Sequence, residues 1–164
     1  MKKLSLSTVI VVFLSIFSTG IQAQTVTNNL NQLKLMQSFV GTWQLEVDKD
    51  TVLVEVQQYG NAFVETDYLI SNGKKSLLSI TNYGFSSKED KFNIFGLEPS
   101  GDYQTYIGSF TTEKKFCQDQ VKNFNPEKVL SRLEIARETP KDMTATFFNS
   151  DGVKTGESKW IKVK

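Results

Sequence analysis

The chain has 164 residues, 39% of them hydrophobic, with 19 basic and 18 acidic residues and no histidine. This length suits a single domain and is enough to bury a sizeable core. The near-zero net charge argues against nucleic acid or an anionic membrane surface as a partner. The lack of histidine removes the usual general base and the commonest metal ligand.

The N-terminus has the pattern of a cleaved secretory signal. Two lysines precede a mostly apolar stretch at residues 4–17, and small residues then lead to a cleavage site after Ala23. The apolar stretch is shorter than the roughly 20 residues that a membrane-spanning helix needs, so an N-terminal anchor is the weaker alternative. We therefore predict a signal peptide at residues 1–23, a mature domain at 24–164 without a membrane span, and a periplasmic or secreted location.

A change of hydrophobic period divides the mature chain into one short helix and a series of strands. In residues 27–37, Leu30, Leu33 and Met36 recur every three residues after the capping residues Thr27 and Asn28, which predicts a helix. Beyond Phe39, apolar and polar residues alternate, as they do in half-buried strands. The first two such segments are expected at 42–47 and 52–57.

A hairpin is the clearest local signal. Asn72-Gly73 supplies the two positive-φ residues of a type I′ turn, so residues 62–70 and 75–85 are expected to pair antiparallel. Similar turn residues separate the remaining segments, for which we expect strands at 92–95, 103–111, 115–121, 129–138, 144–148 and 153–163.

Nine or ten strands joined by short turns form a meander, because parallel strands would need long crossover connections. Closing the meander removes its exposed edges. We therefore predict an all-β fold, an antiparallel up-and-down barrel of about 8–10 strands with a short N-terminal helix. A two-sheet sandwich is the alternative.

The segment 39–45 (FVGTWQL) resembles the start of the first strand in the calycin families, which include the lipocalins. The resemblance implies that Gly41 lets the chain turn into the barrel and that Trp43 plugs its closed end. In lipocalins a basic residue near the last strand lies over this tryptophan. Lys159 and Lys162 occupy the corresponding stretch here.

Most of residues 37–164 resembles an uncharacterised lipocalin-like family of bacterial exported proteins. The resemblance rests on the Gly-Thr-Trp opening, on Tyr83-Gly84-Phe85 and on the strand segment 107–110 (IGSF). Fatty-acid-binding proteins differ, because they insert a helical lid between their first two strands, whereas only residues 48–50 stand there in this chain. The related nitrobindins hold haem through histidine, so that activity does not carry over.

A ligand site inside the barrel would need a few polar side chains among apolar ones. The candidates that we select are Tyr68, Tyr83, Tyr103, Tyr106 and Arg132. For Arg132 the alternative is a solvated surface pair with Glu134, and for the tyrosines it is a place in the barrel wall.

No other chemistry is indicated. There is no Gly-x-Ser-x-Gly motif, no Ser-His-Asp set and no metal-binding spacing, so we expect neither an enzyme nor a bound cofactor or metal. The single cysteine, Cys117, is expected to be buried because Phe116 and Val121 flank it.

Two functions follow from the sequence. The first is an exported barrel that binds a small hydrophobic ligand in its interior. The second is a filled barrel that acts as a protein-interaction or inhibitor module in the cell envelope, and it predicts an exposed apolar patch in loops at 95–97 or 123–126.

Overall fold

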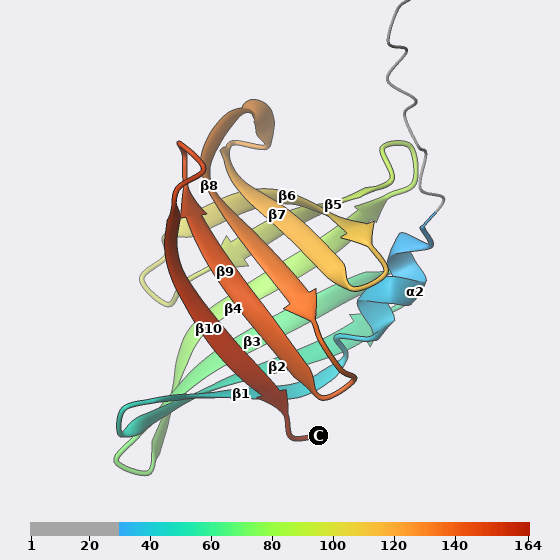
Figure 1. Ribbon diagram of the computed structural model, residues 1–164. Helices are drawn as coiled ribbons and strands as arrows, with labels where there is room; N and C mark the ends of the chain where they lie inside the picture. Colours follow the sequence, from blue (N-terminus) through green and yellow to red (C-terminus); the bar gives the residue numbers. More distant parts are fainter. Residues whose placement is uncertain (1–29) are drawn as a thin grey trace, which may run out of the picture.

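The computed structural model describes residues 30–164, which form one helix and ten strands (Figure 1). The predicted signal peptide at residues 1–23 lies outside the described residues. Within them, no helix is long and apolar enough to cross a membrane. The helix is α2 (Gln32–Gln37), and the strands are β1 (Gly41–Val47), β2 (Asp50–Tyr59), β3 (Ala62–Ser71), β4 (Lys74–Ser86), β5 (Lys91–Leu97), β6 (Tyr103–Thr112), β7 (Lys115–Lys122), β8 (Asn125–Arg137), β9 (Asp142–Asn149) and β10 (Lys154–Lys162).

The ten strands form a closed antiparallel barrel. Each strand pairs with the next along the chain, and β1 pairs with β10 through Trp43 opposite Lys162. The prediction of an all-β barrel with a short helix is confirmed, and the sandwich alternative is wrong. The architecture is compatible with a lipocalin-like fold.

The hairpin of β3 and β4 has the predicted register. Ile70 lies opposite Lys75, and Ala62 lies opposite Gly84. Asn72 and Gly73 have φ angles of 51° and 75°, which a type I′ turn requires.

The largest departures from the predicted boundaries are at the helix and at β8, and the expected capping residues Thr27 and Asn28 lie outside the described residues. The helix begins at Gln32, because the side chain of Asn31 accepts a hydrogen bond from the Lys34 amide and caps it. Strand β8 begins at Asn125, four residues earlier than expected. Register shifts on both sides of Val121 let β8 pair with β7 although Pro126 has no amide hydrogen to donate.

Helix α2 lies across one end of the barrel, and the β1–β2 and β3–β4 turns project at the other end (Figure 1). The Gln32 amide fixes the helix to β6, because it donates to the Phe110 carbonyl at 3.1 Å and accepts from the Phe110 amide at 2.7 Å. Large apolar side chains fill this half of the barrel: Met36, Phe39, Trp43, Phe63, Phe92, Phe110 and Phe116. The end under α2 is therefore solid.

Gly41 and Trp43 have the structural roles that the resemblance implied. Gly41 has a φ of 130°, and a Cβ there would lie 2.3 Å from the Lys164 carbonyl oxygen, so only glycine fits. Trp43 is fully buried and donates from Nε1 to the Phe39 carbonyl at 2.8 Å. The basic residue over its ring is Lys162, whose Nζ lies 5.3 Å from the ring centroid and donates to the Val40 carbonyl.

Candidate functional site

The strand register identifies the side chains that face the interior. Cross-strand partners share a face of a sheet, and Trp43, which is buried in the core, is opposite Val54. Val54 is in turn opposite Asp67, and Asp67 is opposite Ser79. Glu65 lies two residues before Asp67, so both carboxylates of β3 point into the barrel.

Glu65 and Asp67 lie just beyond the apolar end of the barrel. Along β3 they follow the buried Phe63, and each accepts one hydrogen bond from β4. The Tyr83 hydroxyl donates to Glu65 at 2.9 Å, and the Ser79 hydroxyl donates to Asp67 at 2.5 Å. These bonds hold the two carboxyl groups against one wall.

Burial makes these acids weak. Loss of hydration, with a smaller contribution from the charge of Asp67, raises the pKa of Glu65 from 4.5 to about 8. Burial likewise raises the pKa of Asp67. Burial, followed by the charge of Glu65, raises the pKa of Tyr83 well above its ordinary value and that of Tyr106 to about 12. Both tyrosines therefore keep their protons at neutral pH.

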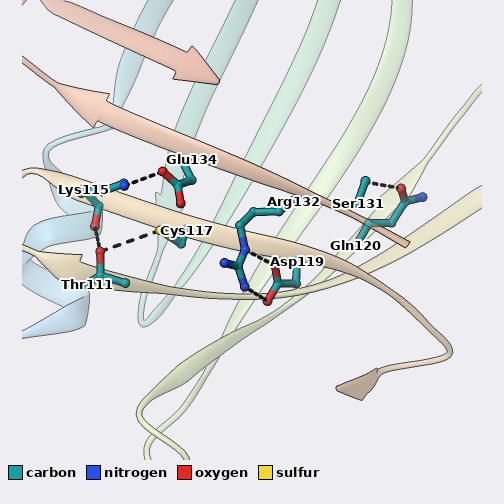
Figure 2. Close-up of polar contacts among 8 residues, drawn as sticks. All are labelled: Thr111, Lys115, Cys117, Asp119, Gln120, Ser131, Arg132 and Glu134. Carbon is teal, nitrogen blue, oxygen red and sulfur yellow. Dashed lines mark hydrogen bonds and ion pairs between the residues drawn. The ribbon is translucent and has the colours of Figure 1, made fainter. Parts of the chain in front are cut away.

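A chain of polar side chains continues from Tyr106 to the far wall. The Tyr106 hydroxyl donates to Gln104, the Gln120 amide donates to the same oxygen at 3.3 Å, and the Ser131 hydroxyl donates to Gln120 at 2.8 Å. Figure 2 shows the last of these contacts between β7 and β8. Polar groups thus line the interior on strands β3, β4, β6, β7 and β8.

The interior on this side contains open space. A pocket of about 320 Å³ lies beside the chain of polar side chains, which is within the range of small-molecule sites. It is lined by the polar Gln104, Tyr106, Gln118, Gln120 and Ser131, by the apolar Leu133, Phe147 and Phe148, and by Arg132 and Thr155. The barrel is therefore filled under α2 and hollow nearer its other end.

Two buried oxygen atoms in this interior lack a hydrogen-bond donor. Within residues 30–164, Asp67 Oδ1 and Gln118 Oε1 have no partner. Gln118 is 8% exposed and faces inward from β7, opposite Gly108. Leaving a buried acceptor unpaired costs about 1–3 kcal/mol, so such atoms call for a partner.

The structure brings together two of the five candidate ligand-binding residues. Tyr83 and Tyr106 point into the interior and lie close enough to Glu65 for its charge to affect both. Tyr68 and Tyr103 point outward. The Lys75 ammonium lies 3.6 Å from the Tyr68 ring centroid, and Tyr103 stacks on Phe95 at 5.6 Å.

Arg132 lies on the outer wall, mostly exposed. Its guanidinium makes two hydrogen bonds to Asp119, at 2.7 and 3.1 Å, as Figure 2 shows. The expected partner Glu134 pairs with Lys115 instead, because β7 presents Lys115 opposite that part of β8. Arg132 also borders the pocket, but its charged group is engaged outside the barrel.

Cys117 is half-buried, which corrects the expectation of a buried thiol. It alternates with the inward-facing Phe116 and Gln118 and so lies on the outer wall, where its sulfur is 3.7 Å from the Thr111 hydroxyl (Figure 2). Partial burial raises the pKa of the thiol.

Sequence reasoning missed the acidic pair and the glutamines. Alternation places Glu65 and Asp67 on the same face of β3 as Phe63, but the opposite face, with Val64, Tyr68 and Ile70, is the more apolar one, so the sequence of this strand contains no signal for two inward-facing acids. Within residues 30–164, no group of three or more His, Cys, Asp or Glu residues is placed to hold a metal ion.

Comparison with known proteins adds no family assignment. No protein-family model matches the chain, and no curated protein matches its sequence.

Proposed function

We propose that the protein is an exported, lipocalin-like barrel that binds a small, partly hydrophobic molecule in its hollow half, and that it is not an enzyme. The observation that carries this proposal is the pocket of about 320 Å³, which is lined in part by Gln118, whose buried Oε1 lacks a hydrogen-bond partner. Buried, unpaired acceptors destabilise the folded barrel, so a purely structural role does not account for them.

Other features support parts of the proposal. The signal-like N-terminus supports export, and the closed barrel with Lys162 over Trp43 supports the resemblance to lipocalin-like proteins. Leu133 and Phe147 give the pocket an apolar side, so a suitable ligand has both an apolar body and a polar group.

Filling the pocket is the sharpest test. Ser131 lines the pocket, whereas its neighbour Leu130 is exposed on the outer wall. We expect protein purified from its native compartment to carry a small molecule in native mass spectrometry, Ser131→Trp to abolish it, and Leu130→Trp to retain it. Bare wild-type protein that also shows no thermal shift with a panel of lipids and small amphiphiles would contradict the proposal.

A second candidate function is a protein-interaction module. The outer wall carries a row of exposed apolar side chains on β4, β5 and β6, in which Leu97 pairs with both Ile80 and Tyr103, and Phe95 stacks on Tyr103. This row includes the expected region 95–97, although that region is a strand and not a loop. A protein partner is supported if wild-type protein captures one specific envelope protein and Ile80→Lys with Leu97→Lys abolishes the capture.

A further inference from the structure

The acids in the interior indicate the chemistry of the ligand more closely than the volume of the pocket does. Glu65 and Asp67 are inward-facing carboxylates separated by one residue, and neither forms an ion pair within residues 30–164. Two basic residues on the same inner face, Arg137 and Lys162, lie near α2, and a third, Lys74 opposite Ser71, is exposed at the tip of the β3–β4 hairpin. Arg137 borders a separate space beside the helix, and Lys162 covers Trp43. Within the described residues the two carboxyl groups therefore have no cationic partner, and once they lose their protons they place uncompensated negative charge in the hollow half.

The hydrogen-bond inventory indicates the same chemistry. The hydroxyl donors of Tyr83 and Ser79 are already used by Glu65 and Asp67, and that of Tyr106 is used by Gln104. Two oxygen atoms remain unpaired: Asp67 Oδ1 on β3 and Gln118 Oε1 on β7, with three strands between them around the ring. Both are acceptors, so the missing group is a donor.

On these observations, and resting on the function proposed above, we propose that Glu65 and Asp67 recognise an organic cation, a primary ammonium attached to a small apolar body. An ammonium group supplies several N–H donors and one positive charge. Charge-assisted hydrogen bonds to buried carboxylates are about twice as strong as neutral ones. Glu65 lies close enough to Tyr106 for its charge to act on that tyrosine, and Tyr106 lines the pocket. The body of the ligand lies against the apolar lining residues Leu133 and Phe147.

The same geometry disfavours the anionic ligands that many apolar barrels take. A fatty acid would bring a third carboxylate next to two others, and the arginine that borders the pocket, Arg132, is already engaged by Asp119. A neutral alcohol would donate one hydrogen bond and leave the carboxylates without a counter-charge.

Binding is expected to depend on pH. The titratable groups that face Glu65 are Asp67 on its own strand, Tyr83 on β4 and Tyr106 on β6, whereas β2 presents only Val54 and Val56 there. The tyrosines stay protonated, so the carboxyl groups of Glu65 and Asp67 determine the charge of this part of the interior. Because Glu65 has to lose its proton before it pairs with a cation, affinity for an ammonium rises as pH increases from 6 to about 8.

The experiment compares three probes of nearly equal shape by isothermal titration calorimetry on the purified protein: 2-phenylethylammonium, 2-phenylethanol and 3-phenylpropanoate. We expect the ammonium to bind at least about tenfold more tightly than the alcohol, because its contacts are charge-assisted, and the carboxylate to bind most weakly. Glu65→Gln and Asp67→Asn are expected to reduce ammonium affinity at least about fivefold and to leave the alcohol unchanged. Glu55→Gln, on the outer wall, is the matched control and is expected to change neither.

Each outcome decides between the two proposals. If the alcohol or the carboxylate binds as tightly as the ammonium, or if both interior variants bind the ammonium like the wild type, cation recognition is wrong while a ligand-binding interior stands. If none of the three probes binds and the native protein also carries no small molecule, both proposals are wrong.

Discussion

At the scale of single residues, the unusual feature of this barrel is a pair of buried acids. Glu65 lies within the barrel beside a second carboxylate, and burial holds its pKa at about 8. A barrel has no structural need for such a pair, since apolar residues of similar size would fill the same space without the cost of burying charge. The pair is therefore an argument for the proposed ligand site.

These acids make stability depend on pH. Between pH 4.5 and about 8, folded Glu65 holds a proton that the unfolded chain has released. Raising pH through this window therefore favours the unfolded state, and the raised pKa of Asp67 acts in the same direction. We expect the midpoint of urea unfolding to be lower at pH 8.5 than at pH 5.5, and this difference to shrink in Glu65→Gln. Equal midpoints for the wild type at both pH values would show that Glu65 ionises normally.

Gly108 illustrates tight packing at the boundary between the filled and hollow halves. A Cβ at Gly108 would lie 2.6 Å from the Phe116 ring and 3.0 Å from Ile94, whereas a Cβ at Gly84 would meet nothing closer than 3.7 Å. We expect Gly108→Ala to lower the free energy of unfolding by about 1–3 kcal/mol, and Gly84→Ala to change it little. Chemical denaturation of the two variants checks this, and equal stabilities would mean that the core near Gly108 is loosely packed.

At the scale of elements, α2 covers one end of the barrel, and the side-chain amide of Gln32 connects it to β6. Gln32→Ala removes both hydrogen bonds to Phe110 and leaves the backbone amide and carbonyl of Phe110 without these partners. We expect a loss of about 1–3 kcal/mol in the free energy of unfolding. Gln37→Ala, an exposed glutamine on the same helix, is the control and is expected to have little effect. Equal effects of the two substitutions would show that α2 is held in place by its apolar contacts alone.

The elements were largely predictable from the sequence, and the site was predictable only in part. Period-2 alternation and the Asn72-Gly73 turn are local signals, so strand identity and the β3–β4 register follow directly from them. The composition of the interior depends on which side chains of distant strands meet. Selecting tyrosines as amphipathic wall residues found Tyr83 and Tyr106 but also included Tyr68 and Tyr103, because alternation within one strand does not tell which face is the inner one. Glu65 and Asp67 were passed over because charged residues on strands usually face water.

At the scale of the whole molecule, the barrel divides into two halves with different roles. Aromatic side chains and α2 make one end solid, which gives the fold its stability. Pairing of β1 with β10 closes the wall, so the other half can stay hollow and polar without leaving a sheet edge exposed. The filled half thereby holds Glu65 and Asp67 in place where it meets the hollow half.

The five tyrosines allow the most direct test of this division. Tyr106 lines the pocket and Tyr83, in the core cluster, reaches Glu65 with its hydroxyl, whereas Tyr59, Tyr68 and Tyr103 lie on the outside. In NMR spectra of protein with ¹³C-labelled tyrosine rings, titration with 2-phenylethylammonium is expected to shift the resonances of the two inner tyrosines and to leave the three outer ones in place. Shifts confined to the outer tyrosines, or no shift at saturating probe, would contradict the account.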